Sequence, residues 1–512
     1  MRPVRSLIAT MVLGLGAWAT GSMTTVTGAG GAGEAGRGPA VLQHHNNPTR
    51  DGLYIEPALT QAAAGRLHRD AAFHVVLRGP TYAQPLFWAA TQPGERDLVI
   101  VATEQNEVSA IDASSGAVVW RRSLGRPVPR KALPCGNIDP LGITGTPVID
   151  RASRTLFLDA MTTPDEGRTK RHVIVALSID DGSTRHDWPV DVSAAVRVGP
   201  IAFDSAVQNQ RGALALLGGA VYVPYGGHFG DCGDYHGWVV GVPIGRPEAP
   251  QAWVTRARGG GVWASGGIAT DGTALYVATG NTFGAASWAD GEAIIRLRPG
   301  PVFSQQPADY FAPADWRALD TADADLGSSG PVLIQVPGAQ PSRLLVALGK
   351  NGEGYLLDPA NLGGIGGAVA RQHVSDEPII NAAAAYTTAA GTYVVFRGRG
   401  IRCPGYPSGD LTALRIGATS PPTIRLAWCA RQNGRGSPMV TTTDGRSEAI
   451  VWSVGAEGDN RLHGFDGDTG RPVFGGGPGD QMSLVRRFQT PIAARGRIFV
   501  SADDQLYAFT TR

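Results

Sequence analysis

One loop of the sequence concentrates side chains that commonly bind metal ions. Residues 225–238 contain His228, Asp231, Asp234 and His236, so two imidazoles and two carboxylates lie close together. Imidazole nitrogen favours ions such as Zn²⁺, whereas carboxylate oxygen also suits Ca²⁺. As a metal site, this loop would favour a hydrolase or lyase in which the ion activates water. The same residue types also make an ordinary polar loop, and spacing alone leaves both interpretations open.

The cysteines form a second group with chemical potential. The chain has four of them and contains no CxxC or CxxCH motif, which disfavours a zinc site and a covalent c-type haem. An even number in an exported chain predicts disulfides, although three pairings are open and free buried thiols are the alternative. The four residues are Cys135, Cys232, Cys403 and Cys429.

The N-terminus predicts export. Two arginines, an apolar stretch over residues 7–15 and a small-x-small cleavage pattern at 17–19 follow one another in the order of a secretory signal peptide. An uncleaved membrane anchor is the alternative, but the apolar stretch is too short to span a bilayer. We expect a signal peptide over 1–19, a flexible linker over 20–42, and a mature protein in the periplasm or the extracellular medium without a stable membrane anchor.

Charge and composition exclude some partners. The formal net charge is +1, which gives no electrostatic basis for binding a nucleic acid. The chain contains 70 Gly and 36 Pro, and only 17% of its residues are charged. Such a composition is typical of many short strands joined by turns.

A repeat dominates the rest of the sequence. Its clearest copy, over 97–125, reads DLVIVAT, NEVSAIDASSG and AVVWRRSLG, which predicts three short strands with an Asp-x-x-x-Gly turn. The pattern returns over 445–474, and weaker copies follow one another at intervals of about 40 to 60 residues, as propeller blades do. We predict an all-β fold over 43–512, an eight-bladed β-propeller of four-stranded antiparallel blades, with seven blades as the alternative.

The last copy of the repeat stops before its final strand. The segment FHVVLR, residues 73–78, precedes the first full blade and can supply the missing strand, which would close the ring. In such a ring, the loops between second and third strands share one face with the blade-to-blade connections. Three of the cysteines fall in these loops, and Cys429 ends a fourth strand at the same face. A Cys403–Cys429 bridge within one blade is sterically easy, and a Cys135–Cys232 bridge would pin loops of nearby blades.

The repeat also carries a family resemblance. The motif N-x-V-x-A-I-D-x-x-x-G-x-x-V-W at 106–120 resembles the repeat of pyrroloquinoline quinone (PQQ) dehydrogenases and of PQQ-like propeller proteins, including an outer-membrane assembly lipoprotein. The resemblance covers nearly all of residues 72–512. It is specific for the fold and not for catalysis, because many relatives bind no quinone.

A segment before the first blade resembles the opening motif of a PQQ-like propeller subfamily. It reads HHNNPTRDG over residues 44–52 and is expected to lie across one face of the ring. We expect His44 and His45 to decorate the surface, with a metal role as the alternative.

Four further stretches resemble the alcohol dehydrogenase branch of the family. Trp263, in GGGVWA, corresponds to the tryptophan that stacks under the quinone, and a flat aromatic ring suits a planar cofactor. Asn281, in YVATGN, corresponds to an amide ligand of Ca²⁺. Lys350, in GKNGEGYLLD together with Asn351, corresponds to the basic residue that touches the quinone oxygens.

The stretch DTADADLG, residues 320–327, lies where the family keeps its catalytic aspartate. The resemblance therefore implies a catalytic role for Asp323 or Asp325, whose carboxylate would take the alcohol proton while hydride moves to the quinone. In this scheme Ca²⁺ would polarise a quinone carbonyl, and Lys350 would stabilise the charge that grows on the reduced quinone.

The chain departs from this branch in the loop over 225–238. His228 stands where the branch has a glutamate metal ligand, and imidazole is a poor ligand for Ca²⁺. Asp231 or Asp234 would have to substitute. The adjacent Cys-Cys pair of the branch is also absent, and only Cys135 remains nearby.

Two functions follow from the sequence. The first is an exported PQQ- and Ca²⁺-dependent dehydrogenase that oxidises an alcohol or sugar hydroxyl. The second is a non-catalytic propeller that binds a protein or glycan through its loop face. In the second case Trp263 packs near the axis, Asn281 and Lys350 belong to turns, and the aspartates cap loops.

Overall fold

The computed structural model describes residues 40–401, 403 and 409–511. The predicted signal peptide and nearly all of the predicted linker lie outside these residues. Within the described ranges, no helix has the length and hydrophobicity needed to cross a membrane.

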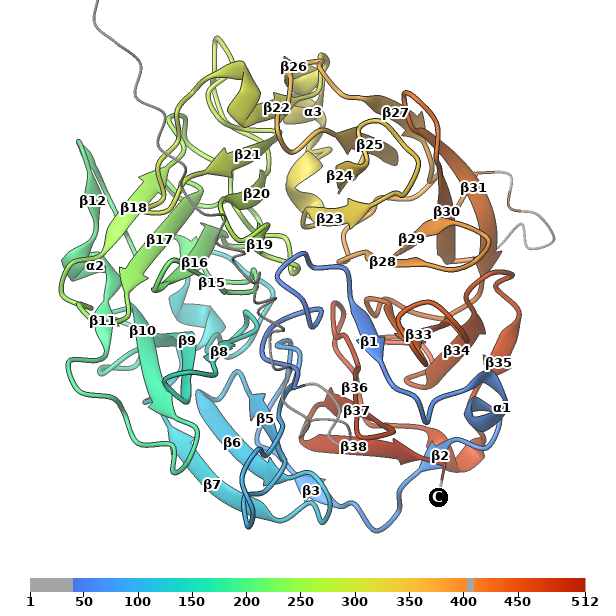
Figure 1. Ribbon diagram of the computed structural model, residues 1–512. Helices are drawn as coiled ribbons and strands as arrows, with labels where there is room; N and C mark the ends of the chain where they lie inside the picture. Colours follow the sequence, from blue (N-terminus) through green and yellow to red (C-terminus); the bar gives the residue numbers. More distant parts are fainter. Residues whose placement is uncertain (1–39, 402, 404–408, 512) are drawn as a thin grey trace, which may run out of the picture. The chain divides into compact units, whose positions relative to one another are not determined.

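The described chain forms a ring of eight small β-sheets around a central axis, as Figure 1 shows. This confirms the prediction of an eight-bladed propeller. In each blade the strands follow one another from the axis outward, and nearly all neighbouring strands are antiparallel. The α-helices in the described residues are short: α1 (Gln61–Ala64), α2 (Val192–Ala195) and α3 (Trp316–Ala322).

The first four blades follow the chain in order. The first blade comprises β4 (Leu86–Trp88), β5 (Leu98–Ala102), β6 (Glu107–Asp112) and β7 (Val118–Ser123), and the second comprises β8 (Val148–Asp150), β9 (Thr155–Thr162), β10 (Arg171–Ser178) and β11 (Val190–Asp191). The third comprises β14 (Gln208–Asn209), β15 (Ala215–Leu217), β16 (Ala220–Gly227), β17 (Trp238–Pro243) and β18 (Gln251–Val254). The fourth comprises β19 (Ala269–Thr270), β20 (Leu275–Thr279), β21 (Ala293–Leu297) and β22 (Tyr310–Ala312), with β26 (Gly364–Ile365) beside β22. A separate hairpin contains β12 (Arg197–Val198) and β13 (Ile201–Ala202).

The last four blades complete the ring. The fifth blade comprises β23 (Val332–Gln335), β24 (Arg343–Leu348), β25 (Glu353–Leu357) and β27 (Ala370–His373), and the sixth comprises β28 (Ala384–Thr387), β29 (Thr392–Arg397), β30 (Leu411–Gly417) and β31 (Thr423–Ala430). The seventh comprises β32 (Met439–Thr442), β33 (Ile450–Val454), β34 (Leu462–Asp466) and β35 (Pro472–Phe474), with β1 (Leu53–Ile55) beside β32. The eighth comprises β36 (Ile492–Ala494), β37 (Arg497–Ala502) and β38 (Gln505–Thr510), with β2 (His68–Arg69) and β3 (Val75–Val76) beside β38.

Packing between neighbouring blades explains why the repeat motif contains a tryptophan and a glycine turn. The indole of Trp120, in the last strand of the first blade, lies against Gly182 in the turn of the second blade, where an added Cβ would come within 2.6 Å of the ring. Trp428 and Gly470 repeat this contact between the sixth and seventh blades. Both glycines have positive φ, at 68° and 71°, which other residues rarely adopt. Each tryptophan therefore fixes one blade onto the glycine turn of the next.

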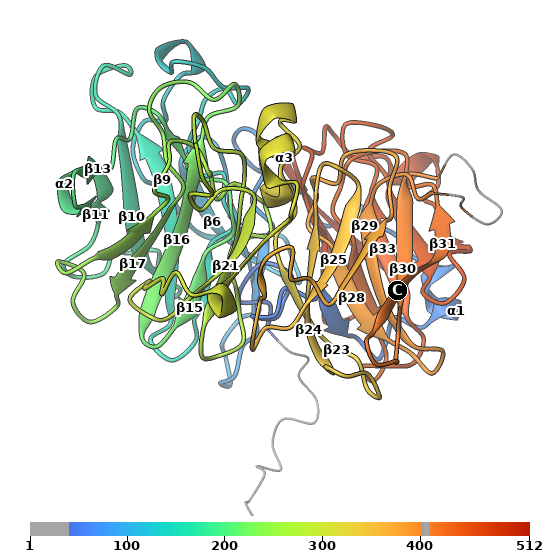
Figure 2. The ribbon, with the colours of Figure 1, turned by 90° about the horizontal axis from the view of Figure 1, so that it is seen from above.

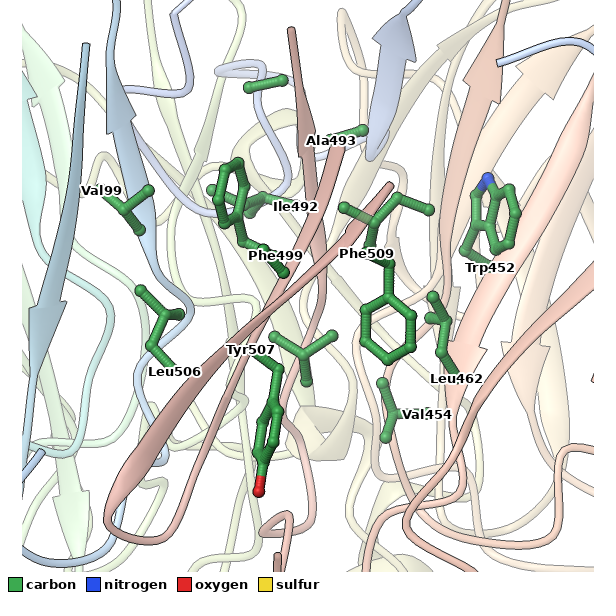
Figure 3. Close-up of a cluster of buried hydrophobic side chains, with 14 of the residues drawn as sticks. Val99, Trp452, Val454, Leu462, Ile492, Ala493, Phe499, Leu506, Tyr507 and Phe509 are labelled. Atoms are coloured by element: carbon green, nitrogen blue, oxygen red, sulfur yellow. The ribbon is translucent and has the colours of Figure 1, made fainter. Parts of the chain in front are cut away.

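Apolar side chains fill the spaces between blades. Figure 3 shows one such cluster, in which Trp452 and Leu462 of the seventh blade lie near Phe509 of the eighth, and Phe499 lies toward Val99 of the first. These five side chains are at most 2% exposed. Because a thin sheet cannot bury both of its faces alone, the blades are stable only as neighbours in the ring.

The N-terminal region closes the ring, as predicted from residues 73–78. Val75 of β3 pairs with Leu506 of β38 in antiparallel register. The upstream strand β2 also pairs with β38, with His68 opposite Thr510. Two short strands therefore complete the last blade.

Residues 41–53 form a hub that lies against the inner strands of the blades. Its backbone carbonyls accept hydrogen bonds from one blade after another. The pairs are Leu42 with Ile149, Pro48 with Thr270, Thr49 with Leu333, Asp51 with Ala385 and Gly52 with Val440. This segment therefore connects the inner strands of five blades.

Arg50 anchors the hub. It is 1% exposed, and its guanidinium donates hydrogen bonds to the carbonyls of Ile268 and Leu214, at 2.8 and 2.7 Å. His44 and His45 are 2% and 0% exposed, with ring centroids 4.3 Å apart. The expectation that these histidines decorate the surface was wrong, because the motif folds into the ring instead of lying on it.

The four cysteines form two disulfides. Cys135 bonds to Cys232, with Cα atoms 6.0 Å apart, and Cys403 bonds to Cys429, with Cα atoms 5.6 Å apart. The first joins a blade-to-blade connection to the loop between β16 and β17. The second lies within one blade. Both pairings agree with the topological argument.

Candidate functional site

A cavity of about 280 Å³ opens among the loops that connect second to third strands and blade to blade. Figure 2 shows α3, which precedes the cavity residue Asp323, on the upper side of the ring. The cavity gathers nearly all of the site residues predicted from the sequence. Its lining includes His228, Asp231, Trp263, Asn281, Asp323, Asp325 and Lys350, together with Asn137, Arg211, Phe229, Tyr235, Ile380, Arg487 and Phe488.

Lys350 and two aspartates form the charged centre of the cavity. The Lys350 Nζ lies 2.5 Å from an oxygen of Asp325 and 2.7 Å from an oxygen of Asp323. The two carboxylates differ in burial, because the Asp325 side chain is 3% exposed and that of Asp323 is 66% exposed. The backbone N–H of Asn281 donates to the other oxygen of Asp325, at 2.7 Å. Asp325 is therefore the carboxylate with a fixed geometry.

Burial and neighbouring charges set the protonation of this centre. Burial raises the pKa of Asp325, and the Lys350 ammonium opposes that rise. For Lys350, burial lowers the pKa, but the Asp325 and Asp323 carboxylates outweigh it and raise the pKa above its ordinary value. Lys350 therefore stays charged, and Asp325 has a stronger affinity for a proton than an exposed aspartate.

A second buried carboxylate lies behind Asp325 and has no counterpart among the sequence predictions. Glu292 is 0% exposed, and its Oε2 accepts a hydrogen bond from the backbone N–H of Leu326 at 2.6 Å. Its other oxygen is buried and has no hydrogen-bond partner within the part of the chain that the structure describes. Burial, and then the Asp325 charge, raise the pKa of Glu292 well above its ordinary value. Glu292 therefore binds a proton more strongly than an exposed glutamate does.

Trp263 forms an aromatic wall of the cavity with cations beside it. The Lys350 Nζ lies 5.3 Å from the Trp263 ring centroid, and the Arg211 guanidinium lies 6.0 Å from the same centroid. Arg211 also lies 5.8 Å from the ring of Phe488. Arg211 and Phe488 were missed in the sequence, because they come from blades far apart along the chain.

The polar loop of 225–238 divides between the cavity and its supports. His228 is 2% exposed, and its Nε2 lies 3.2 Å from the Ala206 carbonyl. Burial lowers the pKa of His228 to about 4, so the ring is neutral near pH 7. Asp231 lines the cavity and accepts a hydrogen bond from the Tyr235 hydroxyl at 2.6 Å.

The other members of that loop lie outside the cavity lining. Asp234 is exposed and lies 3.9 Å from the Arg258 guanidinium. The His236 ring makes a 2.9 Å hydrogen bond with the carbonyl of Thr255. Over residues 40–401, 403 and 409–511, no group of three or more His, Cys, Asp or Glu side chains could hold a metal ion.

Asn351 also lies outside the cavity lining. Its Oδ1 accepts a hydrogen bond from the backbone N–H of Glu353 at 3.1 Å, which stabilises the turn between β24 and β25. Gly352 in this turn has a φ of 74°. Asn351 therefore shapes the loop that presents Lys350, and its contact with a cofactor stays a prediction.

Comparison with known proteins gives one match to a sequence family and several solved structures with a similar fold. Residues 79–228 match the model of a family described as outer membrane protein assembly factor BamB. Over these residues the chain is similar to propellers built from PQQ-type repeats. No curated protein matches the sequence.

Several solved structures share the fold. Quinohemoprotein alcohol dehydrogenase from Comamonas testosteroni has a TM-score of 0.61 and 14% identity, over 93% of this chain and 81% of its own. Quinohemoprotein alcohol dehydrogenase ADHIIG from Pseudomonas putida HK5 has a TM-score of 0.63 and 12% identity, over 92% and 80%. A europium-containing methanol dehydrogenase has a TM-score of 0.63 and 14% identity, over 93% and 99%. At these identities the likeness concerns the fold.

The cavity residues fit a quinone better than they fit Ca²⁺. PQQ is planar and carries carboxylates, which suit the Trp263 face and the cations Lys350, Arg211 and Arg487. A Ca²⁺ ion takes six to eight oxygen ligands. Asp325 already pairs with Lys350 and with a backbone N–H, and a neutral imidazole stands at position 228. The donor set therefore falls short of a Ca²⁺ cage.

Proposed function

We propose that this protein binds PQQ in the cavity and oxidises an alcohol hydroxyl. The observation that carries the proposal is the meeting of Trp263, Lys350 and the buried Asp325 in one cavity, from three separate stretches of sequence. When bound, PQQ would supply the two-electron acceptor for the hydride of the alcohol. The prediction of export joins this proposal, supported by the two disulfides.

Each residue of the centre has a distinct task in this proposal. Trp263 would orient the quinone plane, and Lys350 would place a positive charge beside it. Asp325 would accept the hydroxyl proton, a task that its raised pKa favours. The N–H of Asn281 fixes the carboxylate, so that this base is oriented before substrate arrives. Lys350 would thus provide the local positive charge without a requirement for Ca²⁺.

The test is a titration of metal-stripped protein with PQQ, with and without Ca²⁺, followed by melting temperature and quinone absorbance. Binding to the native state alone stabilises it by about 2.7 kcal/mol when PQQ reaches 100 times Kd. We expect a saturable rise in Tm that needs no Ca²⁺ and is lost in Trp263→Ala. The control Trp188→Phe alters a half-buried indole on the second blade and should keep the rise.

A binding propeller without catalysis is the second candidate. Two observations favour it: the match of residues 79–228 to an assembly-factor family, and the neutral His228 in the metal-ligand position. The partner would be a protein or glycan on the loop face. Absence of any PQQ-induced change in Tm or absorbance would favour this candidate over the dehydrogenase.

A further inference from the structure

The cavity mouth carries an aromatic ring that is exposed to solvent. Phe229 lines the cavity and is 64% exposed, the most exposed large hydrophobic side chain among residues 40–401, 403 and 409–511. An apolar ring on the rim of a concave site commonly contacts a ligand, because burial of that ring then favours binding.

The position of Phe229 is fixed by the surrounding loop. The N–H of Asp231 donates to the carbonyl of His228 at 3.0 Å, which closes a tight turn with Phe229 and Gly230 at its apex. Gly230 has a φ of 102°, and a Cβ there would lie 3.3 Å from the Sγ of Cys135. The Cys135–Cys232 disulfide therefore packs directly against the turn that presents the phenyl ring.

Hydrogen bonds also hold the loop on its other side. The Arg258 guanidinium donates to the carbonyls of Asp231 and Gly233, at 2.9 and 2.8 Å. The Tyr235 hydroxyl donates to the Asp231 carboxylate. Phe229 is thus an exposed ring on a constrained loop, which lowers the entropy cost of binding a ligand against it.

A second phenyl ring lines the cavity from another blade connection. Phe488 is 8% exposed and has a φ of 70°, a left-handed conformation that is strained for an aromatic residue. Its N–H donates to the Arg435 carbonyl at 3.1 Å, and its own carbonyl accepts from the Ser437 hydroxyl at 3.2 Å. Strain of this kind concentrates at functional sites, where the surrounding structure imposes it.

Several polar groups of the cavity are already engaged by neighbouring protein groups. A polyol would need several free groups that converge on its hydroxyls, since each buried polar group without a partner costs binding energy. The engaged pairs are Lys350 with Asp325, Asp231 with Tyr235, Arg487 with Glu457, and His228 with the Ala206 carbonyl.

We infer that Phe229 and Phe488 bind the carbon skeleton of the substrate, and that the substrate class is an alcohol with an aromatic or aliphatic chain, not a free sugar. This inference rests on the proposed dehydrogenase function. Phe229 lies at the entrance and selects the chain, whereas the buried Phe488 lies beside Arg211 deeper in the cavity.

The test compares Phe229→Ala with the wild type in two independent measurements on the full chain after addition of PQQ. The first is binding of benzyl alcohol and of glucose, by saturation-transfer NMR. The second is dye-coupled oxidation of benzyl alcohol and of ethanol. Phe229→Ala should weaken benzyl alcohol binding about tenfold and lower kcat/KM for it to the same extent, while ethanol oxidation changes less than about twofold.

Two further variants complete the design. Phe229→Leu keeps an apolar side chain at the apex and should retain most of the benzyl alcohol affinity. Ile365→Ala, on β26, removes an apolar side chain that is 49% exposed and is not part of the cavity lining, and it should change nothing.

The outcomes separate this inference from the proposed function. Preferential binding of glucose, or benzyl alcohol binding that Phe229→Ala leaves unchanged, would overturn the inference. Benzyl alcohol binding that depends on Phe229, without oxidation of any alcohol, would instead refute the dehydrogenase and leave the ligand class in place.

Discussion

The Lys350 Nζ lies 2.5 Å from an oxygen of Asp325, and only 3% of that aspartate side chain is exposed. An ion pair this deeply placed costs desolvation energy that surface pairs avoid. The same two side chains line the cavity in which we place the cofactor. The stability of the fold and the proposed oxidation therefore depend on the same ion pair. Different substitutions of Lys350 and Asp325 can test the two separately.

Replacement of Asp325 by Asn tests the proton-acceptor role. The amide keeps the shape and can still accept from the Asn281 N–H, but it cannot take a proton from the alcohol. We expect PQQ binding to persist and dye-coupled alcohol oxidation to fall by about 10² to 10⁴. Asp323→Asn, at an exposed carboxylate, is the matched control and should keep most activity. Wild-type turnover in Asp325→Asn would exclude Asp325 as the base.

Replacement of Lys350 by Met tests the energetic cost of an unpaired buried charge. Loss of the ammonium leaves the Asp325 carboxylate without its partner, so the free energy of unfolding should fall by about 3–5 kcal/mol. The double variant Lys350→Met/Asp325→Asn should recover most of that loss, as measured by urea unfolding at pH 7. Additive losses in the double variant would show that the two residues stabilise the fold independently.

His172 should make stability depend on pH. Its Nδ1 lies 2.7 Å from an Asp159 oxygen and its Nε2 lies 3.0 Å from the Gln208 carbonyl, so both nitrogens face acceptors and the ring binds a second proton. Burial lowers the pKa of His172, but the Asp159 charge and hydrogen bond outweigh it and raise the pKa above 6.5. The stabilisation is therefore complete below about pH 6.5 and is lost as pH rises through the folded-state pKa.

The measurement for His172 is Tm from pH 5 to pH 9 for the wild type and for His172→Gln. The Tm advantage of the wild type should be largest at low pH and shrink as pH rises. An advantage that is constant or grows with pH would contradict the protonated state. His186→Gln, at a 93% exposed imidazole, serves as the control.

The two disulfides should differ in their effect on ligand binding at the cavity. They span 97 and 26 residues, so loop-closure entropy predicts losses of about 4.7 and 3.5 kcal/mol when each is replaced by a pair of serines. Only Cys135→Ser/Cys232→Ser also frees the turn that carries Phe229. That variant should weaken ligand binding at the cavity, whereas Cys403→Ser/Cys429→Ser should lower Tm alone. Equal effects of both variants on ligand binding would argue against the loop's role.

The fold could be predicted from the sequence because the repeat is local. The Asp-x-x-x-Gly turn and the tryptophan after it, as at Trp120, are signals of adjacent strands. At Trp120 and at Trp428 the packing partner is the next blade. Trp263, Asn281 and Lys350 were instead proposed from short stretches that resemble family motifs, and the three residues line one cavity.

The residues that were missed have no such local signal. Arg211 and Phe488 come from connections of different blades and meet only when the ring closes. Glu292 immediately precedes β21, where no motif marks it. It stands out only because its side chain is buried beside Asp325. The hub was misjudged because a polar, histidine-rich segment resembles a surface loop. Its burial is favourable because backbone N–H groups from several blades donate hydrogen bonds to its carbonyls, and these donors come from distant parts of the chain.

The pairing of β2 and β3 with β38 determines when the ring can close during synthesis of the chain. At about 5–20 residues per second, the first of these strands waits on the order of 20 to 90 s for its partner to leave the ribosome. Until then the last blade lacks two of its strands, and the ring stays open. A nascent chain with this topology therefore cannot close its ring during synthesis, because the closing strand β38 is made last.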